Sequence, residues 1–159
     1  MKFYLILMLF VPSVSLADSE IIPPKIAAQM NTMLEACWRD KSCETSEVLS
    51  FCGDSIDAGG APLEWVKCQN EILTWWDAKL NEVYKEKIAL QKTYDVDRSD
   101  GYYEDLLRNM QRVWVPFRDA ACNYLAHGQP SGSGATNDEI DCKILKTTEQ
   151  IYFIQNPLG

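Results

Sequence analysis

The stretch NMQRVWVPFRDAACNYL, residues 109–125, concentrates side chains that could take part in chemistry. Arg112 and Arg118 stand on either side of a tryptophan, Pro116 interrupts the helical pattern, and Cys122 follows near the end. The segment is either an active-site helix or a structural helix with a binding surface attached. Arg118 falls at the edge of an apolar stripe, where its stem can be buried while its head pairs with carboxylate or carbonyl groups. Pro116 removes one backbone hydrogen bond and predicts a kink.

Catalytic groups are scarce in the rest of the chain. An enzyme needs a nucleophile, an acid–base group or a cofactor site, and the only histidine, His127, lies beside a glycine in a predicted loop. There is no G-x-S-x-G, no glycine-rich phosphate loop and no C-x-x-C. A carboxylate pair for sugar hydrolysis is the remaining alternative, but Glu82 and Glu86 are at a spacing more typical of a solvated helix face. The sequence therefore predicts a protein that is not an enzyme and has no cofactor.

Metal sites are also disfavoured by spacing. Zinc sites use closely spaced cysteines and histidines, and this chain has no C-x2-C pair and one histidine. Asp95, Asp97 and Asp100 resemble a calcium loop, but Gly101 comes one position late and Leu106 stands where a bidentate glutamate belongs. Turn chemistry explains these aspartates better.

The N-terminus has the pattern of a secretory signal. One lysine precedes an apolar run from Phe3 to Val11, and small residues follow as far as Ala17. The run is too short for a membrane span, and no later segment is apolar enough to be one. We therefore expect residues 1–17 to be a signal peptide, with cleavage near Ala17 leaving a periplasmic or secreted chain that does not span a membrane.

The charge balance narrows the class of partner. Without residues 1–17 the chain has 14 basic and 23 acidic residues. Binding of nucleic acid requires a basic footprint, so no nucleic-acid partner is expected. An acidic surface attracts a basic protein partner, although it could equally serve only to keep an exported protein soluble. The sequence does not specify the oligomeric state.

Apolar residues recur at helical spacing, and no segment alternates with the period of a strand. We expect an all-α fold, a small disulfide-stapled helical domain with two long antiparallel helices and a C-terminal helix. The predicted helices begin near the prolines at 23 and 24, cover 45–52, run from Pro62 to about Lys92 and from 102 to 125, and end with one capped by Asn137 or Asp138.

Each long helix has an apolar stripe that we expect to face the core. The stripe of the first consists of Trp65, Ile72, Leu73, Trp76, Leu80, Val83 and Tyr84. The stripe of the second consists of Leu106, Met110, Val113, Trp114, Phe117, Ala121 and Tyr124, with Gln111, Arg118 and Cys122 along one rim. Trp75 lies off the first stripe, so it is either covered by the N-terminal segment or exposed for a partner.

Three motifs together resemble the LprI-like lysozyme inhibitors. They are CQNEILTWWDAKLNEVY (68–84), LLRNMQRVWVPFRDAAC (106–122) and, after a Gly/Ser segment, CKILKTTEQ (142–150). The family pattern is D-x-x-L-N-x-x-Y on one helix, Q-R-x-W-x-x-(F/Y)-R-D-x-x-C on the next, and a closing cysteine. The matching residues are Asp77, Leu80, Asn81, Tyr84, Gln111, Arg112, Trp114, Phe117, Arg118, Asp119, Cys122 and Cys142.

The resemblance covers residues 52 to about 152 and implies an exported α-helical domain, with lysozyme inhibition as the family's activity. We expect structural roles for the matching motif residues. The sequence TTEQIYFI departs from the family, which usually has an arginine soon after the threonine. Residues 18–51 lie outside the family core and predict an N-terminal helical extension to an LprI-like domain of residues 52–159.

Six cysteines in an exported domain indicate up to three disulfides, for which about fifteen pairings exist. The expected pairs, each closing a predicted loop or turn, are Cys122–Cys142, Cys52–Cys68 and Cys37–Cys43. Closing the Gly/Ser loop with the first of these bonds stabilises the fold by roughly 3 kcal/mol.

The function expected from this resemblance is inhibition of a lysozyme by protein–protein binding. An envelope immunity or general interaction protein is the alternative, and an envelope enzyme is a third. Function in a rigid helical scaffold is usually carried by loops. The two candidate docking loops are GDSIDAGG, with Asp54 and Asp57, and HGQPSGSGATNDE, with Gln129, Ser131 and Ser133. Both could instead be solvated connectors.

Overall fold

The computed structural model describes residues 24–40, 45–55, 62–96, 100–128 and 134–156, and the regular structure within them is helical. In chain order the helices are α1 (Pro24–Asp40), α2 (Thr45–Ser55), α3 (Pro62–Tyr94), α4 (Tyr102–His127) and α5 (Ala135–Gln155). The expected all-α fold is therefore confirmed. The predicted signal peptide lies outside the described residues.

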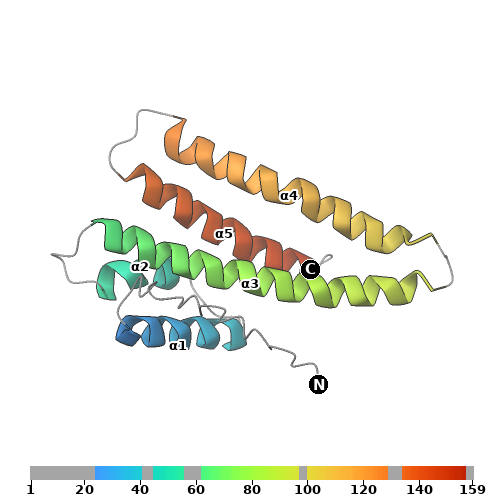
Figure 1. Ribbon diagram of the computed structural model, residues 1–159, viewed down its shortest axis with the longest axis horizontal. Helices are drawn as coiled ribbons and strands as arrows, with labels where there is room; N and C mark the ends of the chain where they lie inside the picture. Colours follow the sequence, from blue (N-terminus) through green and yellow to red (C-terminus); the bar gives the residue numbers. More distant parts are fainter. Residues whose placement is uncertain (1–23, 41–44, 56–61, 97–99, 129–133, 157–159) are drawn as a thin grey trace, which may run out of the picture.

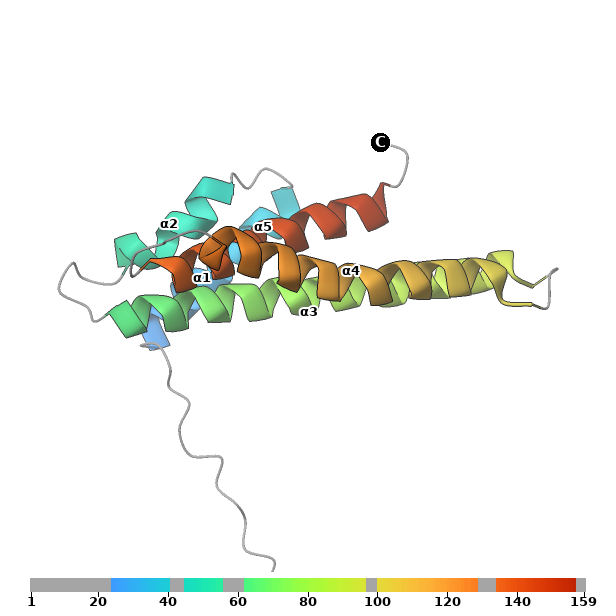
Figure 2. The same cartoon turned by 90° about the horizontal axis from the view of Figure 1, so that it is seen from above.

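The long helices α3 and α4 run antiparallel, and α5 packs along both of them (Figure 1). Contacts of α5 with α3 and with α4 are more extensive than those between α3 and α4. The joined ends of α3 and α4 extend beyond the end of α5 (Figure 2). Helices α1 and α2 lie on the side of α3 that is away from α4 (Figure 1). The fifth helix is therefore the element that holds the long pair together.

The core lies between α3 and α5 and continues beneath α1 and α2. Its buried apolar side chains include Met30, Leu34, Val48, Ile72, Trp76, Leu80, Val83, Ile140, Ile144, Ile151 and Ile154. Trp38 of α1 packs edge-on against Trp76, with 6.4 Å between ring centroids, and the half-buried Trp75 packs against Trp76 from the same helix. Each fully buried aliphatic side chain contributes about 1.5–3 kcal/mol. The N-terminal helices therefore share one core with the rest of the chain.

The apolar stripe of α4 does not face this core, so the sequence expectation for that helix is wrong. The stripe residues Leu106, Val113, Phe117 and Tyr124 are 51, 69, 62 and 68% exposed. The buried residues are instead Arg118, Cys122 and Ala126, while Met110 and Trp114 are half-buried. At 100° per residue the buried row lies about 160° around the helix from the apolar row. Polar and covalent contacts with α3 and α5, rather than apolar area, set the rotation of α4.

Helix α4 begins with a cap supplied from beyond the end of α3. Gly101 occupies the N-cap with φ of 65°, a left-handed conformation that glycine adopts without strain, and it has no side chain to cap the helix. The buried Asp95 instead accepts hydrogen bonds from the backbone N–H groups of Tyr103 and Glu104, each 2.9 Å long. These are free N–H groups of the first helical turn. The aspartate of the connecting turn therefore fixes where α4 starts.

Two of the expected disulfides are confirmed. The bonds Cys52–Cys68 and Cys122–Cys142 join α2 to α3 and α4 to α5, with Cα–Cα distances of 5.8 and 5.5 Å. Both distances are normal for a disulfide. Cys37 is also disulfide-bonded, and its predicted partner Cys43 lies outside the described residues.

Two boundaries differ from those expected. Helix α2 continues to Ser55, so Asp54 lies in its last turn and not in a loop. Helix α5 begins at Ala135, and Gly134 occupies the N-cap position expected for Asn137 or Asp138. Helix ends depend on local hydrogen bonds that composition alone places only to within one or two residues.

Asp141 of α5 faces the interior and weakens the fold when it is charged. The half-buried carboxylate accepts a 2.5 Å hydrogen bond from Nε2 of the buried Gln69 of α3. Burial, together with the nearby charge of Asp138, raises the pKa of Asp141 from 3.8 to about 6. The folded state thus holds this proton more tightly than the unfolded chain. Its stabilising contribution is full below pH 3.8 and is lost as the pH rises through about 6.

We expect Asp141→Asn to raise the melting temperature at about pH 7.5 and to change it little at about pH 4, because asparagine keeps the acceptor and removes the charge. Thermal unfolding followed by circular dichroism at both pH values checks this. Glu86→Gln, at an exposed position of α3, is the control and should show no such pH dependence. An equal effect of Asp141→Asn at the two pH values would contradict the assignment.

Candidate functional site

Side chains of α3 and α4 line an open pocket of about 450 Å³ between the two helices. The lining residues are Asp77, Leu80, Asn81 and Tyr84 of α3 and Arg108, Gln111, Arg112, Val115 and Arg118 of α4. On each helix they recur after three or four positions, with one adjacent pair each (Leu80 and Asn81, Gln111 and Arg112), which places them in one row along one side of the helix. The pocket therefore arises from two facing rows on antiparallel helices.

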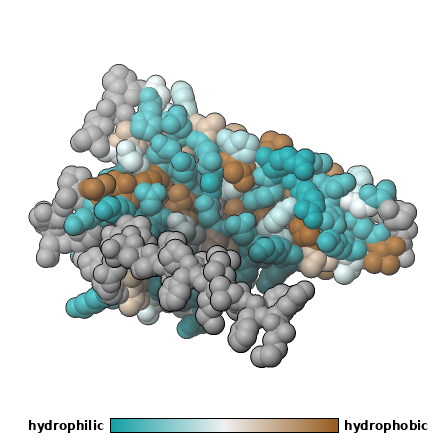
Figure 3. All heavy atoms as spheres, in the orientation of Figure 1, coloured by the Kyte–Doolittle hydropathy of each residue, from teal (hydrophilic) through white to brown (hydrophobic). Residues whose placement is uncertain are grey.

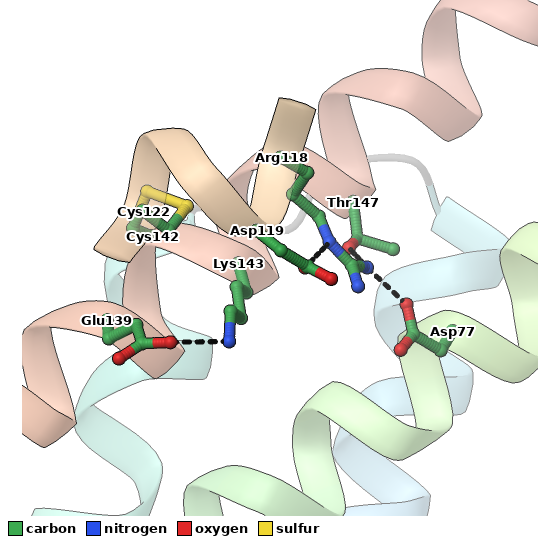
Figure 4. Close-up of polar contacts among 8 residues, drawn as sticks. All are labelled: Asp77, Arg118, Asp119, Cys122, Glu139, Cys142, Lys143 and Thr147. Carbon is green, nitrogen blue, oxygen red and sulfur yellow. Dashed lines mark hydrogen bonds and ion pairs between the residues drawn. A yellow bond between two sulfur atoms is a disulfide. The ribbon is translucent and has the colours of Figure 1, made fainter. Parts of the chain in front are cut away.

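Arg118 is the buried charged member of this lining, with 8% of its surface exposed. Its Nη1 donates to Asp77 Oδ1 of α3 at 2.6 Å and to Thr147 Oγ1 of α5 at 2.9 Å, and its Nε donates to Asp119 Oδ1 at 2.9 Å (Figure 4). The ring of Trp114 lies against the guanidinium, 5.3 Å from centroid to Cζ. A buried cation is tolerated only when it is paired and hydrogen-bonded in this way. The arginine thereby joins three helices through one group.

A second polar contact joins α4 to α5 beside the pocket. Nε2 of the buried Gln150 donates to Oε1 of Gln111 at 3.0 Å and lies 3.8 Å from the sulfur of Met110. Gln111 lines the pocket, and its side-chain amide is held there by Gln150 of α5. Helix α5 contributes no lining residue of its own. Helix α5 therefore positions the pocket wall from behind.

Two further arginines stand on the exposed side of the pocket. Arg108 pairs with Glu104, one turn earlier in α4. Arg112 donates to Asn109 Oδ1 at 3.0 Å, and no carboxylate of a described residue forms an ion pair with it. A guanidinium has five N–H donors, so most of those of Arg112 remain available to a ligand. Three arginines and one aspartate make this pocket a basic site on a chain with a net charge of −8.

The chemistry of this lining suits binding of an anion. Guanidinium groups stay protonated in proteins and cannot serve as a general base, and the carboxylate of Asp77 is occupied by Arg118. Asn81 and Tyr84 add uncharged hydrogen-bonding groups to the same surface. A planar guanidinium fits a carboxylate through two parallel hydrogen bonds. The pocket is therefore a candidate site for a carboxylate or a similar anionic group.

The only histidine belongs to a separate ion-pair group on α4 and α5. His127 Nε2 lies 3.0 Å from Glu139 Oε2. Lys143 Nζ lies 2.6 Å from Oε1 of the same carboxylate (Figure 4). The hydrogen bond from Lys143, with a smaller contribution from His127, lowers the pKa of Glu139. Within the described parts of the chain, no cluster of three metal-ligating side chains occurs. These contacts supplement the Cys122–Cys142 bond in joining the two helices.

Most of the motif residues found in the sequence meet at the pocket. Those that line it are Asp77, Leu80, Asn81, Tyr84, Gln111, Arg112 and Arg118. Trp114 and Asp119 contact Arg118, whereas Phe117 lies outside the cluster and is 62% exposed. The lining residue Arg108 was missed by sequence reasoning, although its position one turn before Arg112 puts it in the same row. Thr147 belongs to the motif CKILKTTEQ, but its contact with Arg118 could not be predicted, because the two residues lie 29 positions apart in the chain.

Of the docking residues expected from the sequence, Asp54 is the one that the structure describes, and it is not among the lining residues of this pocket. Asp54 is exposed in the last turn of α2. Asp57, Gln129, Ser131 and Ser133 lie outside the described residues. The α3–α4 pocket is therefore a candidate binding surface that was not expected from the sequence.

Comparison with known proteins gives one match. A family model described as "Lysozyme inhibitor LprI" matches residues 52–154, a span that includes every lining residue of the pocket and confirms the resemblance carried by the motifs. No curated protein and no solved structure matches the chain. None of the helices in the described segments is long and apolar enough to cross a membrane.

Replacing Arg118 with methionine should lower the free energy of unfolding by about 3 kcal/mol, the low end for breaking a buried ion pair. The cost is at the low end because Asp77 and Asp119 are 40% and 47% exposed and can be rehydrated. Urea unfolding under non-reducing conditions measures it. Arg112→Met, on the exposed side of the pocket, is the matched control and should change stability by less than about 0.5 kcal/mol. Equal stabilities of the two variants would refute the role of Arg118.

Proposed function

Because the chain belongs to the lysozyme inhibitor LprI family, we propose that it is an exported protein that inhibits a lysozyme by protein–protein binding. The family match over residues 52–154 is the observation that carries this proposal. All five cysteines among the described residues are disulfide-bonded, which supports an oxidising extracytoplasmic compartment. The proposed protein acts in the periplasm or outside the cell after cleavage near Ala17, and it is not an enzyme.

The pocket on α3 and α4 offers a means of inhibition. A lysozyme cleaves its substrate with two carboxyl side chains that flank the scissile bond in a sugar cleft. Arg112, which forms no ion pair with a carboxylate of the described residues, can bind such a group bidentately. Asn81 and Tyr84 can hydrogen-bond neighbouring polar groups of the enzyme. In this proposal the exposed side of the pocket meets the catalytic carboxylates and keeps substrate away from them.

The net charge supports the approach of a basic enzyme. A chain with a net charge of −8 attracts a cationic partner over a distance of about one Debye length, roughly 8–10 Å at moderate salt. Such steering raises the association rate more than it strengthens the final contact. The acidic surface and the basic pocket therefore act at different stages, the first in encounter and the second in the bound complex.

The two segments that the sequence suggested as docking loops, GDSIDAGG and HGQPSGSGATNDE, remain a second proposed docking surface. Asp54 is exposed at the end of α2, and Asp57 follows it in the chain. Gln129, Ser131 and Ser133 belong to the segment between α4 and α5. The end of α4 and the start of α5 lie at the same end of the bundle as the start of α3 (Figure 1). One end of the bundle thus competes with the α3–α4 pocket as the site of contact.

Inhibition of muramidase activity by the chain without residues 1–17 tests the function. We expect near-stoichiometric inhibition of at least one muramidase from a panel of animal and bacterial enzymes, and weaker inhibition at about 0.3 M salt than at about 0.03 M salt, because steering is screened. Absence of inhibition across the panel, together with binding to an unrelated exported toxin, would favour an immunity protein instead.

Three variants locate the contact. We expect Arg112→Glu to weaken inhibition by about tenfold or more, since it places a carboxylate against carboxylates. Lys25→Glu, the same charge change at an exposed position of α1, which contributes no residue to the pocket lining, should lose much less. The double change Asp54→Asn and Asp57→Asn probes the end of the bundle. Inhibition that survives Arg112→Glu but falls with the double change would move the docking surface to that end.

A further inference from the structure

Helix α4 carries an apolar seam that the described parts of the chain leave exposed. The seam residues, alternately four and three positions apart, are Leu106, Met110, Val113, Phe117, Ala120 and Tyr124. Four of the six are large and between 51% and 69% exposed. Ala120 is exposed as well, and Met110 is half-buried. This alternation is the heptad spacing by which two helices pack their side chains together.

No charged side chain interrupts the seam. The positions that flank it are Asn109, Pro116 and Asn123 on one side and Leu107, Trp114 and Ala121 on the other. Every charged residue between Leu106 and Tyr124 falls on the remaining sides of the helix: Arg108, Arg112, Arg118 and Asp119. A helix side that faces water in a globular protein ordinarily carries charge. The seam therefore has the composition of an interface.

The exposed area of the seam approaches what a stable dimer needs. From their exposed fractions, Leu106, Val113, Phe117 and Tyr124 together expose roughly 500 Å², in the upper part of the range of about 300–600 Å² for the largest apolar patch of a monomer, which is often functional. Brown, apolar side chains are visible among teal ones along the part of the surface where α4 lies (Figure 3). A standard interface buries about 800 Å² per partner, and the exposed flanking residues Asn109, Pro116 and Asn123 enlarge the face that the seam offers.

We propose that α4 pairs with α4 of a second copy of this chain, antiparallel, about a two-fold axis at the level of Val115. The seam is symmetric about that residue: Leu106 mirrors Tyr124, Met110 mirrors Ala120, and Val113 mirrors Phe117. In each pair a larger side chain meets a smaller one, so the two seams interdigitate. A two-fold interface requires one patch to complement itself. A different partner protein would not require such symmetry, and this is why the second copy is the occupant.

The pairing is compatible with the acidity of the chain and with the pocket. The seam and its flanks contain no charge, so no like charges are brought together and desolvated at the contact. Arg112 and Arg118 lie about 120° around α4 from the seam, and the pocket therefore stays open. Each dimer presents two pockets. This inference does not rest on lysozyme inhibition, because the experiment that tests it measures the mass of the chain in solution and uses no lysozyme.

Sedimentation equilibrium of the chain without residues 1–17, at about 10–200 µM, tests the dimer. We expect a concentration-dependent mass that rises to that of two chains. Val113→Glu should raise the dimer dissociation constant by about a hundredfold or more, with unchanged helix content because Val113 is exposed. Val96→Glu, the same change at a 76% exposed position off the seam, should leave the dimer intact. A monomeric parent chain, or equal behaviour of the two variants, overturns the proposal.

Cysteine cross-linking tests the orientation, since the described residues contain no free thiol. Antiparallel pairing brings position 106 of one copy beside position 124 of the other. A mixture of Leu106→Cys and Tyr124→Cys chains should therefore form a disulfide between unlike variants under mild oxidation. Cross-linking of Leu106→Cys to itself in preference to the mixed product would overturn the antiparallel arrangement.

Discussion

The buried guanidinium of Arg118 is the constraint on which the arrangement of the long helices depends. Its donors reach Asp77 on α3, Asp119 on α4 and Thr147 on α5, and an uncompensated charge at a position 8% exposed would cost several kcal/mol. All three partners must therefore be present together. One side chain thereby sets how α3, α4 and α5 meet, and the Cys122–Cys142 bond, one turn further along α4, holds the same rotation covalently.

That rotation has two consequences on opposite sides of α4. It turns the row of Gln111, Arg112 and Arg118 toward α3, where it forms a pocket with the row that begins at Asp77. It also turns Phe117 and its apolar neighbours into solvent. A helix whose rotation followed apolar area alone would bury the second row and expose the first. The polar contacts thus decide which surface of α4 is available to partners.

The proposed function divides between long-range and short-range electrostatics. The net charge of −8 acts across the whole surface and favours a cationic enzyme. The pocket arginines act only in contact, where a carboxylate can be paired bidentately. An inhibitor requires no catalytic group of its own, and the pocket offers fixed donors in place of a nucleophile or a base. Membership of the lysozyme inhibitor LprI family and the chemistry of the pocket therefore agree.

The sequence by itself determined the helices, two of the disulfide pairings and the motif that marks the family, because each depends on local spacing or on loop closure between neighbouring elements. The stripe of α3 was predicted correctly for Ile72, Trp76 and Leu80, but the prediction is wrong for Trp65, which is 40% exposed. Only the tertiary structure decided that the stripe of α4 faces outward, and that Arg118, assigned to its rim, is buried. Periodicity shows which residues share a side of a helix, but not whether that side meets its own chain. For α4, the hydrogen bonds of Arg118 to Asp77 and Thr147 decide which side of the helix meets the rest of the chain. These two residues lie 41 and 29 positions from Arg118 in the sequence, so no local pattern reveals the contacts.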